Sequence, residues 1–81
     1  MDKMISRLKA DFPNHSFDVR KGMFGMQLLV DGTIATNTWD MGTELVNNVA
    51  FAESVKNLNA EDSLYMFLKL KIELYLNQKN S

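Results

Sequence analysis

The stretch LKLKIELYL, residues 68–76, decides how the C-terminal part of this chain folds. Its apolar and polar residues alternate without exception, which is the period of a half-buried strand. Its composition is mainly leucine, lysine and glutamate, which favour a helix. From Ala60 to Leu76 there is no glycine or proline, and an unbroken run of 17 residues exceeds the usual length of a strand. The sequence therefore predicts a helix, and the alternative is a short helix at 60–67 followed by a fourth strand.

As a helix, this stretch is apolar on two sides. Lys69, Glu73 and Asn77 form one narrow polar stripe, and Lys71 lies between the two apolar faces. One face consists of Leu64, Leu68, Ile72, Tyr75 and Leu76 with Tyr65 beside it, and the other of Phe67, Leu70 and Leu74. A helix of this kind is usually covered on more than one side. One face can cover a sheet, and the second needs another helix of the chain or a partner. Lys71 is expected to extend its ammonium group to solvent along its apolar stem.

Upstream of this helix, the hydrophobic pattern predicts a short helix and three strands. The expected elements are a helix ending near Asp11, a strand from Phe17, a turn at 22–25, a strand at 26–30, an Asp-Gly hairpin loop at 31–32 and a strand from Thr33 to about Trp39. Asp-Gly between apolar runs is a strong hairpin signal because both residues tolerate positive φ.

A two-residue Asp-Gly loop fixes the register of the second and third strands. The pairs expected on one side are Val30 with Thr33, Leu28 with Ala35 and Met26 with Asn37, and those on the other are Leu29 with Ile34 and Gln27 with Thr36. The first side, joined by Phe17, Val19 and Trp39, is the expected core. Leu29 and Ile34 then lie on the outer face, with Asp18 and Arg20 nearby, and these four residues are candidates for partner binding.

The C-terminal half is predicted to hold two helices. The first runs from about 41 to 57 with Met41, Leu45, Val49, Ala52 and Val55 as its apolar stripe. Phe51 lies off that stripe and is expected to pack on the last helix or to contact a partner. Asn59 is the expected N-cap of the last helix. The fold class is therefore α+β, with residues 1–81 as one domain: a helix, a three-stranded antiparallel meander, and two helices packed on one sheet face.

The sequence contains no recognisable catalytic or metal-binding pattern. There is no cysteine, so disulfides, zinc–thiolate sites and thiol chemistry are excluded. His15 is the only histidine, and its neighbour Ser16 points to the opposite side of an extended chain. The four glycines form no phosphate-binding loop. We therefore expect a protein that is not an enzyme and that uses no metal, cofactor or small-molecule substrate.

The charge distribution argues against binding to duplex nucleic acid. Residues 22–62 carry Lys56 against six acidic residues, although the net charge of the whole chain is only −1. The basic residues gather near the N-terminus: Lys3, Arg7, Lys9, Arg20 and Lys21. A nucleic-acid-binding accessory role for these residues is the alternative hypothesis. The N-terminus has no signal-peptide pattern and no stretch suits a membrane span, so a cytoplasmic protein is expected.

These observations favour a small non-enzymatic module that binds another protein or a second copy of itself. The candidate partner-binding residues are Met23 and Phe24 in the 22–25 turn, Leu29, Ile34, Asp18 and Arg20 on the outer sheet face, and Phe51 and Lys71 on the C-terminal helices. The order of a helix, three strands and two helices resembles the layout of some compact phage-encoded inhibitors, such as certain anti-CRISPR proteins. That resemblance of layout implies a phage or mobile-element inhibitor or adaptor and carries over no functional residues.

Overall fold

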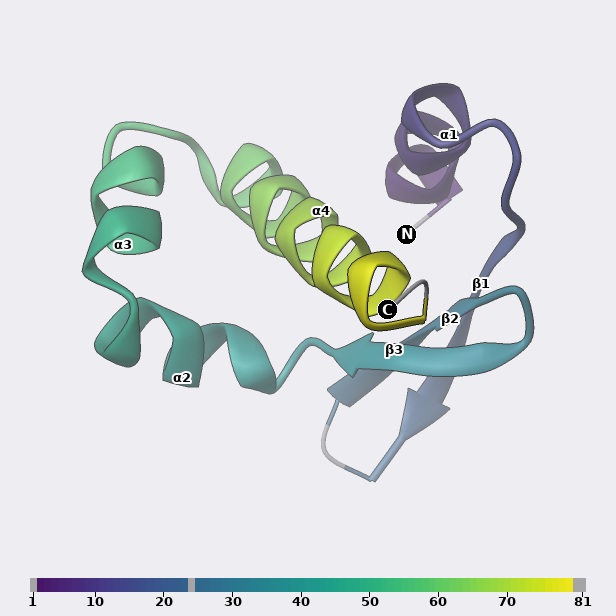
Figure 1. Cartoon of the computed structure of the whole chain (residues 1–81). Coiled ribbons are helices and arrows are strands. Elements are labelled where there is room, and N and C mark those ends of the chain that lie inside the picture. Colours follow the sequence, from purple (N-terminus) through teal and green to yellow (C-terminus); the bar gives the residue numbers. More distant parts are fainter. Residues whose placement is uncertain (1, 24, 80–81) are drawn as a thin grey trace.

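The computed structural model describes residues 2–23 and 25–79 (Figure 1). In chain order the elements are α1 (Asp2–Asp11), β1 (Phe17–Gly22), β2 (Gly25–Val30), β3 (Thr33–Asn37), α2 (Asp40–Asn47), α3 (Val49–Val55) and α4 (Ala60–Lys79). This order confirms the predicted α+β class and the predicted helix at residues 68–76, which lie within α4. The single helix expected over 41–57 is instead two helices, α2 and α3.

The three strands form an antiparallel sheet in the order β1-β2-β3. The predicted pairs Val30 with Thr33 and Leu29 with Ile34 are confirmed. Beyond them the register shifts by one residue, because β3 contributes an extra residue at a β-bulge. Leu28 therefore pairs with Thr36 and Gln27 with Asn37, so the three other predicted pairs are wrong. The shift places the Thr36 side chain in the core opposite Leu28, the position that the predicted register gave to Ala35.

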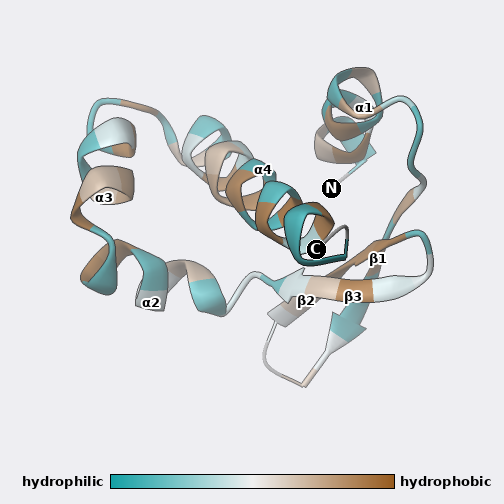
Figure 2. Cartoon of the chain, in the orientation of Figure 1, coloured by the Kyte–Doolittle hydropathy of each residue, from teal (hydrophilic) through white to brown (hydrophobic). Residues whose placement is uncertain are grey.

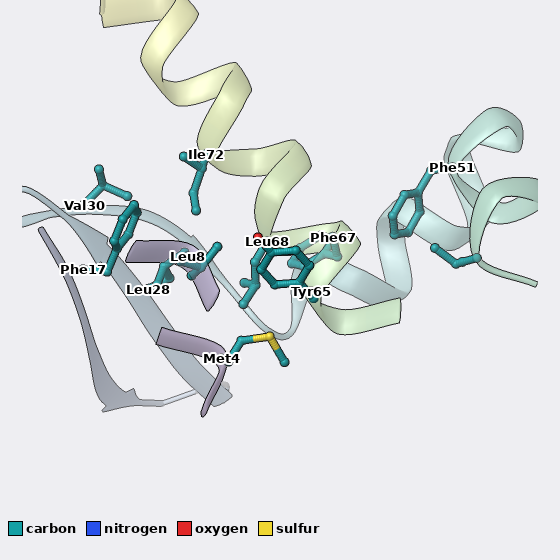
Figure 3. Close-up of a cluster of buried hydrophobic side chains, with 11 residues drawn as sticks. Met4, Leu8, Phe17, Leu28, Val30, Phe51, Tyr65, Phe67, Leu68 and Ile72 are labelled. Carbon is teal, nitrogen blue, oxygen red and sulfur yellow. The ribbon is translucent and has the colours of Figure 1, made fainter. Parts of the chain in front are cut away.

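The core lies between one face of the sheet and α4, with α1 on one side of α4 and α2 and α3 on the other (Figure 1). Apolar residues occupy the middle of α4 and the strands beneath it (Figure 2). The buried hydrophobic residues come from both layers (Figure 3): Met4, Leu8, Phe17, Leu28, Val30, Phe51, Val55, Tyr65, Phe67, Leu68 and Ile72. Both apolar faces predicted for α4 contribute to this set: Tyr65, Leu68 and Ile72 from one face and Phe67 from the other.

Asn48 separates α2 from α3. Its backbone is extended, with φ −124° and ψ 94°, and its side-chain Oδ1 accepts a 3.0 Å hydrogen bond from the Phe51 amide. Asn48 therefore acts as the N-cap of α3, and asparagine is among the best residues for this role. The break changes the direction of the chain, so Phe51 becomes buried and Val49 remains 76% exposed. The predicted stripe through Leu45 and Val49 is thus wrong, because it assumed one continuous helix.

Trp39 also differs from the prediction. It precedes α2 and is 67% exposed, whereas the sequence placed it in the core. The chain turns before it: the Thr38 amide donates to the Met26 carbonyl at 2.8 Å, and Thr38 Oγ1 accepts from the Met26 amide at 3.0 Å. These bonds end β3 at Asn37, so the strand alternation on which the prediction relied does not extend to Trp39.

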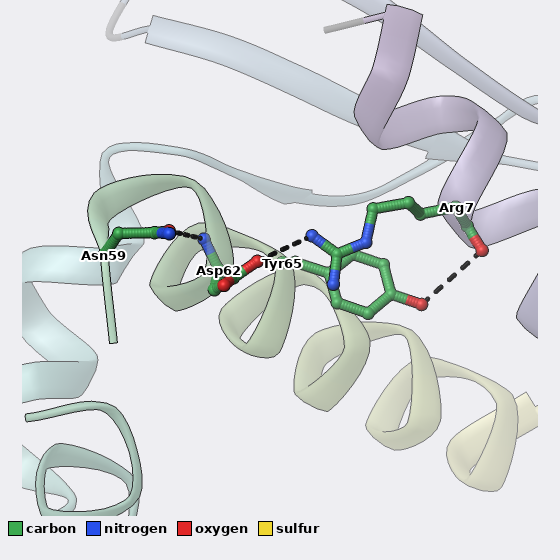
Figure 4. A network of polar contacts seen from close by, with 4 residues as sticks. All are labelled: Arg7, Asn59, Asp62 and Tyr65. Atoms are coloured by element: carbon green, nitrogen blue, oxygen red, sulfur yellow. Dashed lines mark hydrogen bonds and ion pairs between the residues drawn. The ribbon is translucent and has the colours of Figure 1, made fainter. Parts of the chain in front are cut away.

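A polar network joins α1 to the first turn of α4 (Figure 4). Arg7 Nη1 donates to Asp62 Oδ1 at 2.9 Å, and the guanidinium carbon lies 3.9 Å from the centre of the Tyr65 ring. Asn59 Oδ1 accepts from the Asp62 amide at 2.8 Å, which confirms Asn59 as the N-cap. Arg7 is therefore engaged in packing α1 on α4, and one of the five basic residues of the nucleic-acid alternative is held within the fold.

The loop after α1 is tied to the β2–β3 hairpin by Asp31. Asp31 Oδ1 accepts a 2.8 Å bond from the Ser16 amide, and Oδ2 lies 2.7 Å from His15 Nδ1. The hydrogen bond to His15, followed by that from the Ser16 amide, lowers the pKa of Asp31 below its ordinary 3.8. The Ser16 hydroxyl also bonds to Asp31 rather than to His15. This arrangement stabilises a loop and does not pair a nucleophile with a base.

Candidate functional site: an apolar groove between α3 and α4

A groove of about 420 Å³ lies between α3 and α4. Its lining residues come from α3 and the preceding cap on one side and from α4 on the other: Asn48, Ala50, Phe51, Ser54, Met66, Lys69, Leu70 and Glu73. Phe51 is the buried member of this set, Leu70 is half-buried and Met66 is more exposed. We call this feature the α3–α4 groove. It is a surface on which apolar side chains are grouped and partly accessible to solvent.

The α3 wall is positioned by an aromatic contact and local hydrogen bonds. The Phe51 and Phe67 rings meet edge to face, with their centroids 6.2 Å apart (Figure 3). The Ser54 hydroxyl donates to the Phe51 carbonyl at 2.7 Å. Because Phe67 is fully buried in the domain core, Phe51 connects the groove to that core. The prediction that Phe51 packs on the last helix is confirmed, so Phe51 supports the groove rather than projecting from the surface.

The second support of the groove is an ion pair between α2 and α4. Lys71 Nζ lies 2.6 Å from Glu44 Oε1, and both side chains are mostly buried. Hydrogen bonds from Lys71 and then from Asn48 lower the pKa of Glu44 below its ordinary 4.5. The prediction that Lys71 extends its ammonium group to solvent is therefore wrong. Lys71 fixes α2, and through Asn48 the start of α3, relative to α4.

Replacing Glu44 with glutamine should lower the free energy of unfolding by about 1–2 kcal/mol at pH 7, because Lys71 loses a charged partner in a half-buried setting. The folded-state pKa of Glu44 is lowered, so its stabilising contribution is complete above pH 4.5 and declines as the pH falls through the lowered value. Urea unfolding from pH 7 to pH 3 measures both effects. The difference in stability between the two proteins should shrink as the pH falls below 4.5.

Glu53→Gln is the matched control, since Glu53 pairs with Lys56 at 2.8 Å but both side chains are more than half exposed. It should cost no more than about 0.5 kcal/mol. Equal losses for the two variants would contradict a positioning role for the Glu44–Lys71 pair.

The edge of the groove carries two charged side chains. Lys69 and Glu73 line it from α4, and within residues 2–23 and 25–79 neither takes part in an ion pair. Close to the groove in sequence, Val46 and Val49 are 80% and 76% exposed and Leu74 is 45% exposed. Val49 and Leu74 thus belong to the two helices that form the groove, and Val46 belongs to α2.

The outer sheet face carries the other predicted candidates. Leu29 is half-buried and pairs with Ile34, which is 42% exposed, while Asp18 lies opposite Leu29 on the neighbouring strand. Arg20 Nε donates to Gln27 Oε1 at 2.7 Å. The predicted grouping of Leu29, Ile34, Asp18 and Arg20 on one face is therefore consistent with the strand pairing. It is a mixed face with one small apolar pair.

The turn between β1 and β2 presents Met23, which is 89% exposed. Phe24, the other candidate there, lies outside the described residues. Sequence reasoning identified Leu70 as part of a second apolar face of α4 but did not identify Met66 or Ala50. The signal available for Met66 was its spacing of four residues before Leu70, which puts both on one side of the helix.

The described residues show neither a metal site nor a membrane-spanning helix. No group of three or more histidine or acidic side chains within 2–23 and 25–79 is arranged to hold a metal ion. In the same part of the chain, no helix combines the length and apolar character needed to cross a membrane.

Comparison with protein-family models, with curated proteins and with solved structures finds no match to this chain.

Proposed function

We propose that this protein is a non-enzymatic protein-binding module, an inhibitor or adaptor that acts through the α3–α4 groove. The observation that carries the proposal is one open hollow in which Met66 and Leu70 of α4 are partly exposed beside the buried Phe51 of α3. Grouped apolar side chains that are accessible to solvent mark interaction surfaces, whereas singly scattered ones do not.

The surroundings of the groove favour a protein over a small molecule. Phe51, Met66 and Leu70 give the groove an apolar lining, and Lys69 and Glu73 add charge at its edge. Protein interfaces have this composition of an apolar centre with a polar rim. Small-molecule sites instead enclose most of the ligand and direct several polar groups toward it. A short amphipathic helix laid between two helices is a common occupant of such a groove.

The proposal places the protein in the cytoplasm and among the compact inhibitors or adaptors of phages and mobile elements. The absence of cysteine is compatible with a reducing compartment, since the fold uses no disulfide. The small size of the domain and its accessible apolar groove suit a protein that acts by occupying the surface of another.

Replacing Leu70 with aspartate tests the proposal, because a carboxylate in the groove must be desolvated when a partner binds. Captured amounts of each partner from extracts of the native host should fall at least tenfold for Leu70→Asp relative to the unmodified protein. The measurement is quantitative mass spectrometry of the captured proteins. Thermal unfolding of the variant, followed by circular dichroism, verifies that the domain remains folded.

Ile34→Asp is the matched control, since it introduces the same charge on the outer sheet face at a residue that is already 42% exposed. It should retain capture. Loss of capture by Ile34→Asp together with full retention by Leu70→Asp would move the binding surface to the sheet and contradict the proposal.

A further inference from the structure

Lys69 and Glu73 give the α3–α4 groove a charge order along α4. They lie four residues apart, one turn of the helix, with the basic residue nearer the N-terminus. Within the described residues neither charge is neutralised by an ion pair. An occupant that matches this order presents an acidic group opposite Lys69 and a basic group opposite Glu73.

A second copy of the same helix meets this requirement if it runs antiparallel. A two-fold axis near position 71 places Lys69 of each copy opposite Glu73 of the other, so one arrangement forms both pairs. Two-fold interfaces are self-complementary in this sense, since each contact occurs twice. A parallel copy in register would instead place like charges together, which is unfavourable.

The apolar residues obey nearly the same symmetry. Met66, Leu70 and Leu74 recur every four residues along α4, and an antiparallel copy centred on Leu70 places Met66 opposite Leu74 of its mate. The centres of the charged and apolar patterns differ by one residue, a rise of about 1.5 Å along the helix. Long side chains accommodate that offset. Leu74, which is 45% exposed in the single chain, would then be covered.

We propose that a second copy of this chain occupies the α3–α4 groove, with the two α4 helices antiparallel and Lys69 of each facing Glu73 of the other. This inference rests on the proposed function, because it names the partner of the same groove. The 20-residue α4 is about 30 Å long, comparable to the longest dimension of the molecule, so the contact can extend across one whole side of the domain.

Charge reversal tests the proposal with unusual specificity. Lys69→Glu gives a copy with two acidic groups at the groove, and Glu73→Lys gives one with two basic groups, so each variant alone should dimerise at least tenfold more weakly than the unmodified protein. The double variant Lys69→Glu/Glu73→Lys restores opposite pairing and should dimerise within about threefold of it. An equimolar mixture of the two single variants should form heterodimers.

Sedimentation equilibrium at low ionic strength measures these dissociation constants. Lysine and glutamate have similar helix propensities, so the substitutions preserve α4, and circular dichroism checks that they do. Lys9→Glu on α1 is the control for net charge and should leave dimerisation unchanged. Heterodimer formation is the readout that a general loss of stability cannot produce.

Two results would overturn the inference. The first is an unmodified protein that remains monomeric at millimolar concentration. The second is that neither the double substitution nor mixing of the single variants restores dimerisation. If partner capture still depends on Leu70 in that case, the proposed function stands and only the identity of the occupant is wrong. If capture is also indifferent to Leu70, both proposals fail.

Discussion

Replacing Phe67 with alanine should remove about 3–5 kcal/mol from the free energy of unfolding and leave little cooperative structure at 37 °C. Phe67 is fully buried, and its ring contacts Phe51 across α3 and α4. The Lys71 ammonium lies 5.8 Å from the centre of the same ring. Truncation therefore opens a cavity and loosens both supports of the groove. Domains of this size have a total stability of only about 4–12 kcal/mol. Urea unfolding followed by circular dichroism measures the loss.

Phe12→Ala is the matched control for this truncation. Phe12 is half-buried and meets Phe17 edge to face with centroids 6.1 Å apart, so it forms one aromatic contact at the margin of the core. Its truncation should cost clearly less, about 1–2 kcal/mol. A Phe67→Ala variant that loses no more than Phe12→Ala would show that α4 is not the centre of the core.

Replacing Gly25 with alanine should destabilise the domain by about 2–3 kcal/mol. The loss has two causes, a backbone conformation that is unfavourable for alanine and a steric clash of its Cβ with Thr38. Gly25 has φ +104°, which costs an L-residue roughly 1–2 kcal/mol. A Cβ placed there would lie 2.7 Å from Thr38 Oγ1, the atom that accepts the Met26 amide hydrogen bond. Thr38 must then move and give up that bond, which adds about 1 kcal/mol. Urea midpoints report the difference.

Substitutions at two other glycines separate the cost of positive φ from the cost of the Thr38 contact. Gly32 has φ +86° but no atom within 4 Å of an added Cβ, so Gly32→Ala should show the cost of positive φ alone. Gly42 is helical and also open, so Gly42→Ala should stabilise α2 by about 0.5–1 kcal/mol. Equal losses for the Gly25 and Gly32 variants would contradict the role given to the Thr38 contact.

The helix over 68–76 was predictable because its signals lie in the local sequence. An N-cap at Asn59 and a run without glycine or proline outweigh an alternating pattern, and the structure explains that pattern by covering both apolar sides. The Asp31-Gly32 hairpin likewise determined the pairs nearest to it. Signals of this kind act within a few residues, so they can be read without knowing the tertiary contacts.

The bulge in β3 and the break at Asn48 were not predictable from the same signals. No glycine or proline marks either position. At Asn48 the side chain accepts a hydrogen bond from the Phe51 amide and caps a new helix. Such side-chain bonds to the backbone compete with the hydrogen bonds of a continuous helix. The break determines that Phe51 is buried and that the groove exists. Since the groove depends on this one residue, the sequence could identify an apolar face on α4 but not the hollow beside it.

The predicted candidate residues show the same difference between local signals and tertiary contacts. Ile34 was correctly expected to lie exposed on the outer sheet face, because strand alternation is a local property. The sequence left open whether Met23 points outward or folds back on the core, and the structure shows it 89% exposed. Lys71 was expected to reach solvent, but Glu44 on a different helix lies within ion-pair distance of it. A contact between residues 27 positions apart needs the tertiary arrangement, which hydrophobic periodicity does not supply.

The most direct test of the central claim, that the α3–α4 groove is the binding surface, is a series of ¹H–¹⁵N NMR spectra of the labelled protein. The 9.3 kDa chain suits this measurement, made on the unmodified protein by dilution from millimolar to micromolar concentration and by addition of any captured partner. The largest shift changes should lie in residues 48–54 and 66–74. Changes confined to Met23, Leu29 and Ile34, with those two segments unmoved, would contradict it.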